Sequence, residues 1–382
     1  MGFGQNKYSN KVCSLKDINS KFILQKIFYN LEHKKLLEII HYNKRIQSLL
    51  NIGLNDYINE YLKIEIELIP KKNKYGHFIC FKDDYFPYYH FYFNDNIVEI
   101  KRNYLNKDDK VEKIKVILDK EIKSFDGLFE YCECIKKINF IKFNRKDINN
   151  MSNMFYKCPF LKKIIFNNFH TDNVTNMSQL FYDCVSLEEL NLSKFNTINV
   201  TDMSFMFWSC VKLKKVNLSS FNTIKVTKMN HMFHYCRSLE ELDLSHFNTI
   251  NVTDMKFMFS NCSSLKELDV SHFNTNNVTD MSCMFSDTLV KKLDVSKFNT
   301  INVTDMSDMF VGCTSLKELN LSNFNTNKVE DIRYMFSDCS SLEKLDISNF
   351  NTEHIILKNG VLDGCTSLKK YEEIEKKIYN KK

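Results

Sequence analysis

The sequence predicts an α/β solenoid of about ten stacked coils, preceded by a small α+β domain. A 26-residue pattern recurs in register from 125 to 371. Within each unit, the spacing of apolar residues changes from a helical period to strict alternation. A fixed period of this length is typical of a solenoid, in which each unit packs on its neighbours.

Two residue columns define the repeat. Nine of the 13 cysteines share one position in the unit: Cys132, Cys158, Cys184, Cys210, Cys236, Cys262, Cys313, Cys339 and Cys365. A second column holds Met151, Met177, Met203, Met229, Met255, Met281 and Met306 and continues with Ile332. Thr288 takes the cysteine position in the one coil that is a residue short.

One unit is predicted to form helix, turn, strand and turn. Val200, Met203 and Phe207 share one face of a helix, whereas Val216 and Leu218 alternate with polar residues as in a strand with one buried face. Asn222 is expected in a buried turn between coils. Ten coils at the inter-strand spacing predict a parallel sheet roughly 45 Å long, with helical turns on the opposite side. Such a molecule offers a binding surface and no enclosed pocket.

The repeated phrases resemble a known family. The strand L-x-x-L-x-L-S-x-F-N-T, joined to N-V-T-D-M-S-x-M-F-x-x-C, is similar to the BspA-like leucine-rich repeat, also called the 26-residue bacterial surface protein repeat. The resemblance implies a right-handed, leucine-rich-repeat-like stack over 125–371. It also implies binding or adhesion and transfers no catalytic residue.

Length and charge divide the chain further. We expect an N-terminal domain over 1–124, the solenoid over 125–371 and a charged cap or tail over 372–382. Residues 1–124 contain 22 Lys and Arg against 16 Asp and Glu, whereas the remainder contains 31 of each. The neutral repeat region argues against nucleic-acid binding.

Location is inferred from missing signals. No N-terminal segment resembles a signal peptide and no apolar run is long enough to span a membrane, so we expect an intracellular protein. The alternative is the cell surface, reached by another export route. In that case N-x-[ST] sequons would invite glycans, and the Asn-Val-Thr copies begin at Asn173, Asn199, Asn251, Asn277 and Asn302.

The candidate binding residues lie on the predicted strands. One outward-facing column consists of Asn191, Asn217, Asp243, Asp269, Asp294, Asn320 and Asp346, and it forms either a polar binding ribbon or a side-chain hydrogen-bond ladder. His246 and His272 occupy equivalent positions near Asp243 and Asp269, where they form a small metal or proton-responsive site or are simply copied with the repeat. Lys297 is a further departure from the repeat consensus, so these side chains are included in the candidate partner surface.

The cysteine column has three interpretations. The thiols are buried, reduced and space-filling, they pair as disulfides between coils in an oxidising compartment, or they bind a metal, although their spacing lacks a zinc signature. The sequence contains no G-x-S-x-G, no glycine-rich phosphate loop and no H-E-x-x-H. We therefore expect no enzyme activity, cofactor or metal.

Apolar spacing over 20–50 resembles an F-box. The resemblance implies that Ile27, Leu31, Leu36 and Leu37 contact a Skp-type cullin adaptor. The alternative is a plain helical cap domain. The strand-like run at 114–118 is expected to begin the solenoid.

Together these observations predict a non-enzymatic protein–protein interaction scaffold that binds a partner on its sheet face. A sharper form of the hypothesis makes it a substrate receptor of a ubiquitin ligase. The alternative is a BspA-like cell-surface adhesin.

Overall fold

The computed structural model describes residues 43–50, 54–81, 83–353 and 355–379. The chain divides into two compact units, Met1–Lys63 and Ile64–Lys382, so the division lies well before the expected boundary at 124/125. In the first unit the described helices are α3 (Lys44–Leu50) and α4 (Leu54–Leu62). The four residues of the F-box-like hypothesis, Ile27, Leu31, Leu36 and Leu37, lie outside the described residues.

The second unit begins with a five-stranded sheet in the order β3-β5-β1-β6-β7. Its strands are β1 (Ile64–Pro70), β3 (Tyr89–Phe93), β5 (Ile114–Leu118), β6 (Ile135–Lys142) and β7 (Lys163–Phe166). β1 runs antiparallel to both β5 and β6, and β6 pairs with β7 in parallel. The expectation that 114–118 begins the solenoid is therefore wrong, because β1 lies between β5 and the first coil.

Alternation of apolar residues explains why β1 takes this central place. Ile64, Ile66 and Leu68 are all fully buried on one face of the strand. The short strands β2 (Gly76–His77) and β4 (Tyr104–Leu105) pair nearby, and the 3-10 helix η2 (Asp83–Tyr88) leads into β3. The strands of the 64–118 region thus continue into the sheet of the first coils.

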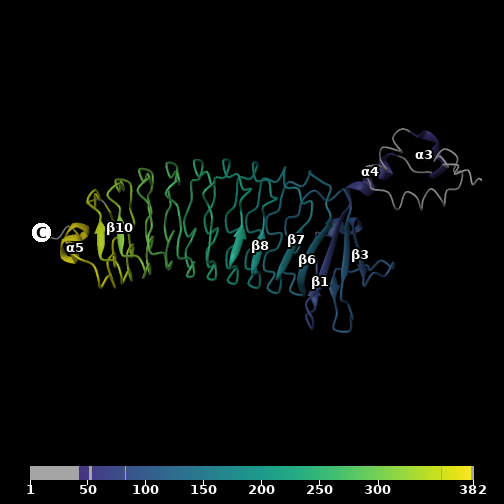
Figure 1. Ribbon diagram of the computed structural model, residues 1–382, viewed down its shortest axis with the longest axis horizontal. Coiled ribbons are helices and arrows are strands. Elements are labelled where there is room, and N and C mark those ends of the chain that lie inside the picture. Colours follow the sequence, from purple (N-terminus) through teal and green to yellow (C-terminus); the bar gives the residue numbers. More distant parts are fainter. Residues whose placement is uncertain (1–42, 51–53, 82, 354, 380–382) are drawn as a thin grey trace, which may run out of the picture. The chain divides into compact units, whose positions relative to one another are not determined.

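The predicted continuous sheet is wrong. After β7, the strands among the described residues form only two pairs, β8 (Glu189–Asn191) with β9 (Lys215–Asn217) and β10 (Glu318–Asn320) with β11 (Lys344–Asp346). Parallel bridges elsewhere in the repeat join all the coils instead, at Ser124, Asn150, Asn176, Asp202, Lys228, Asp254, Asp280, Asp305, Asp331 and Leu357. Figure 1 shows the coils stacked in a row from β6 to α5.

The predicted helix in each coil is also wrong. In the coil at 203–210, the amides of Met206, Trp208 and Cys210 donate to the carbonyl three residues earlier, as in β-turns. Phe205 and Ser209 have φ of 58° and 57°, which an α-helix does not allow. The amides of Phe205 and Phe207 donate to carbonyls of the next coil. The spacing of three and four residues therefore reflects linked turns, since the backbone bonds run between coils and not along a helix.

A stack of phenylalanine rings fills the centre of the coils. Neighbouring rings are nearly parallel, with centroids 5.3 to 5.9 Å apart, along Phe129, Phe155, Phe181, Phe207, Phe233, Phe259, Phe285, Phe310 and Phe336. The methionine column beside them is fully buried. These rows of identical side chains place equivalent residues of successive coils next to one another.

Helix α5 (Tyr371–Tyr379) lies at the C-terminal end of the stack (Figure 1). Its Ile374 and Ile378 are buried, and the Lys377 carbonyl accepts a hydrogen bond of 3.0 Å from the Thr352 hydroxyl. Among the described residues, none of the helices combines the length and the apolar character needed to span a membrane.

Candidate functional site

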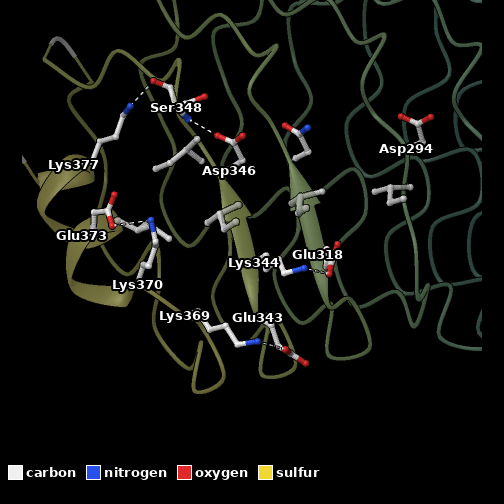
Figure 2. Close-up of a pocket in the computed structure, with 16 residues that line it drawn as sticks. Asp294, Glu318, Glu343, Lys344, Asp346, Ser348, Lys369, Lys370, Glu373 and Lys377 are labelled. Atoms are coloured by element: carbon white, nitrogen blue, oxygen red, sulfur yellow. Dashed lines mark hydrogen bonds and ion pairs between the residues drawn. The ribbon is translucent and has the colours of Figure 1, made fainter.

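A groove of about 940 Å³ lies between the last strands and helix α5 (Figure 2). Three members of the predicted outward column, Asp294, Asn320 and Asp346, line it together. Its apolar lining includes Leu345, which is half-buried, and Ile347. The repeat brings these residues together because strand positions 26 residues apart are neighbours in adjacent coils.

Ion pairs surround this groove. Glu318 and Lys344 approach to 2.6 Å, Glu343 and Lys369 to 2.7 Å, and the third pair, Lys370 with Glu373, lies at the start of α5 (Figure 2). The hydrogen bond and charge of Lys369 lower the pKa of Glu343. Because the pairs are exposed to solvent, each contributes little to the stability of the fold. They can therefore exchange partners at small cost when another charged surface approaches.

All seven residues of the outward column serve a local turn. The side-chain oxygen of each accepts the backbone N–H of the serine two residues later, at 2.9 to 3.1 Å. Each of these bonds remains within one coil. The residues are Asn191, Asn217, Asp243, Asp269, Asp294, Asn320 and Asp346. The column is exposed, and each member retains polar atoms that face solvent.

The two predicted histidines contact the preceding coil. Nε2 of His246 lies 2.8 Å from the Leu218 carbonyl oxygen, and Nε2 of His272 lies 2.9 Å from that of Leu244. At the same position of its coil, Ser220 also donates to a carbonyl of the preceding coil. These contacts assign the two histidines a role in joining coils.

Neither histidine belongs to a metal centre in the described part of the chain, where no three His, Cys, Asp or Glu side chains could together hold a metal ion. Hydrogen bonds from the serine two residues later are the main reason that the pKa values of Asp269 and Asp294 are lowered. The exposed Lys297 adds a smaller effect in the same direction through its charge.

The cysteine column consists of free thiols that form hydrogen bonds. All twelve cysteines in the described residues are free, and Cys210 is one of the fully buried members. Its thiol donates to the Phe181 carbonyl of the preceding coil at 3.1 Å, and Cys158, Cys184, Cys236, Cys262, Cys313, Cys339 and Cys365 make the same contact in theirs. Burial raises the pKa of the Cys210 thiol well above its usual value. In these eight coils the thiol therefore fills space and adds a hydrogen bond to the preceding coil.

The sequons are engaged in a similar way. Side-chain amides of Asn173, Asn199, Asn251, Asn277 and Asn302 donate to backbone carbonyls of the preceding coil at 2.7 to 2.9 Å. A glycan would be attached to that same nitrogen. The Asn-Val-Thr phrase thus has a structural role in joining coils.

Two features escaped the sequence analysis. The first is a column of buried threonines, each of which bonds the peptide of the next coil; in one pair, the Thr249 hydroxyl donates to the Asn274 carbonyl oxygen and accepts from its N–H, both at 2.8 Å. Asn222 was expected to fill this role, but it is exposed. The signal in the sequence was the phrase F-N-T, which recurs at 195–197, 221–223, 247–249, 273–275, 298–300, 324–326 and 350–352.

The second is an aromatic row on the turn side of the early coils. Tyr156 and Tyr182 stack at 4.5 Å, Tyr182 and Trp208 at 4.3 Å, and Phe205 and His231 at 4.4 Å. Tyr156, Tyr182 and Trp208 are half-buried. The row was missed because turn positions vary between coils.

No curated protein is significantly similar to the chain. The solved structures with similarity include a leucine-rich repeat protein from Bacteroides ovatus ATCC 8483, at 16% identity over 68% of this chain and 71% of that chain, with a TM-score of 0.36. The T. pallidum leucine-rich repeat protein has 20% identity over 54% and 77%, with a TM-score of 0.30. A leucine-rich cell surface protein from Faecalibacterium prausnitzii A2-165 has 16% identity over 62% and 82%, with a TM-score of 0.25.

These structural likenesses are too distant to transfer a function. A family model described as "Mycoplasma protein of unknown function, DUF285" matches residues 123–217, 210–293 and 288–376. Together the matches extend over 123–376, which is 254 of the 382 residues. The chain therefore belongs to the DUF285 family.

Proposed function

We propose that the protein is a non-enzymatic interaction scaffold that binds a protein partner in the groove between β10, β11 and helix α5. The observation that carries the proposal is that half-buried Leu345 lies in the same groove as exposed lysine–glutamate ion pairs. Protein interfaces combine an apolar centre with a polar rim in this way. An extended segment with both acidic and basic side chains would match the groove.

The test requires a partner and two sets of variants. After the partner is identified by proximity crosslinking in the source cell, its affinity for the purified full-length chain is measured by calorimetry. Reversing the exposed groove lysines, Lys344→Glu with Lys369→Glu, should weaken binding about tenfold or more, because attraction to acidic groups of the partner becomes repulsion. Trp208→Ala, on the turn side, is the matched control. Weaker binding by Trp208→Ala with unchanged binding by the groove variant would move the site to the aromatic row and refute the proposal.

The sharper hypothesis adds a ubiquitin-ligase role. It requires the F-box-like segment over 20–50 to engage a Skp-type cullin adaptor, with Ile27, Leu31, Leu36 and Leu37 as contacts. Co-purification of the adaptor, abolished by Ile27→Asp and Leu36→Asp, would support it. Failure of the folded wild-type protein to retain the adaptor would exclude it.

The alternative is a BspA-like adhesin at the cell surface, and the engaged amides count against glycans at the five Asn-Val-Thr sequons. Protease treatment of intact and permeabilised cells separates the two locations. Cleavage on intact cells supports the adhesin, whereas protection until permeabilisation supports the intracellular scaffold.

A further inference from the structure

Two cysteines from distant parts of the chain meet at one backbone oxygen. The Cys80 thiol donates to the Glu130 carbonyl oxygen at 2.9 Å, and the Cys132 sulfur lies 3.8 Å from the same oxygen. A backbone bond of 2.8 Å from the Cys80 N–H to the Leu128 carbonyl holds the segment after β2 against the first coil. The two thiols are therefore adjacent although they lie 52 positions apart in the sequence.

Cys132 differs from the other members of the cysteine column. In later coils the thiol donates to a phenylalanine carbonyl of the preceding coil, as Cys158 does to Phe129 at 3.0 Å. The column begins at Cys132, whose thiol instead has the longer contact to Glu130 and a neighbouring thiol, Cys80. At Cys132, a second cysteine lies beside the thiol where later coils have a phenylalanine carbonyl of the preceding coil.

The two thiols differ in access. Cys132 is fully buried, whereas Cys80 is half-buried and lines a cavity of about 310 Å³ together with Tyr85 and Lys123. A small reagent can reach Cys80 through this cavity. Cys132 does not line this cavity.

The two thiols also differ in acidity. A hydrogen bond from Cys132 lowers the pKa of Cys80 and outweighs the opposing effects of burial and of the Glu130 carboxylate. Burial and the same bond raise the pKa of Cys132 well above its usual value. Cys283 is also half-buried, but burial and surrounding aspartates raise its pKa to about 12. The thiolate, which is the reactive form, is therefore favoured at Cys80 over Cys283.

We propose that Cys80 and Cys132 are a dithiol pair that reduces a peroxide and closes a reversible disulfide between the segment after β2 and the first coil. The Cys80 thiolate attacks one peroxide oxygen, the O–O bond breaks, and the other oxygen leaves as alcohol or water after taking up a proton. Cys132 then attacks the sulfur of the Cys80 sulfenic acid, and the S–O bond breaks to release water that carries the Cys132 proton. Overall, the two thiols together lose two electrons and the peroxide gains two.

The experiment uses the reduced full-length protein and hydrogen peroxide as the probe. Samples are quenched with N-ethylmaleimide at intervals, digested and analysed by mass spectrometry. We expect a Cys80–Cys132 crosslinked peptide that disappears with dithiothreitol, and loss of free Cys80 about tenfold or more faster than loss of free Cys283. These measurements on the wild type need no variant to fold.

Variants assign the two roles. Cys132→Ser should retain the Cys80 sulfenic acid, which dimedone labels, whereas Cys80→Ser should leave Cys132 reduced. Cys283→Ser is the control and should form the disulfide at the wild-type rate. Equal oxidation rates of Cys80 and Cys283, or conversion of wild-type Cys80 to sulfinic acid without a crosslink to Cys132, would overturn the proposal.

Discussion

The threonine column provides a stringent test of how successive coils are joined. Thr249 is 2% exposed, and its hydroxyl makes two hydrogen bonds with the Asn274 peptide, both of 2.8 Å. Thr249→Val keeps the shape of the side chain but leaves that partly buried N–H and C=O without partners. Each unsatisfied buried group costs about 1 to 3 kcal/mol, and partial burial favours the lower values. We expect the free energy of unfolding to fall by about 2 to 4 kcal/mol.

Thr249→Ser is the matched control because serine keeps the hydroxyl and loses only a methyl group. Its loss should be about 1 kcal/mol, the value for one buried methylene-sized group. Both variants are compared with the wild type by urea denaturation followed by circular dichroism. If burial of apolar surface alone stabilised this position, valine would be as good as threonine and better than serine. A valine variant at least as stable as the serine variant would refute the hydrogen-bond argument.

Two further predictions concern the stack and its histidines. Phe259→Ala should lower the free energy of unfolding by about 3 to 5 kcal/mol, because a fully buried ring between Phe233 and Phe285 is lost; a loss below about 1 kcal/mol in the same urea assay would contradict it. Burial lowers the pKa of His231 and of His234 to about 4, so the unfolded chain binds more protons between pH 6.5 and 4 and stability from these groups is lost as pH falls through that window. Urea midpoints at pH 7.5 and 4.5 should therefore differ less in His231→Gln/His234→Gln than in the wild type, and an equal difference in both proteins would reject this assignment.

The repeat pattern was sufficient to predict a stack of coils and its buried columns. A period of 26 residues places Met203 and Cys210 beside their equivalents in each neighbouring coil, and both are fully buried. The outward column was likewise predicted as exposed, since strand alternation determines which side chains face solvent. These features follow from periodicity, which is a property of the sequence alone.

Backbone hydrogen bonding was decided only by the tertiary structure. The spacing of Met203, Met206 and Phe207 fits both a helix and a series of turns, and the choice depends on whether amides bond along the chain or to the next coil. Pairing of β1 with β6, and the meeting of Cys80 with Cys132, likewise join segments with no common pattern. A periodic sequence determines which residues become neighbours in adjacent coils, whereas contacts between non-repeated segments depend on how the whole chain packs.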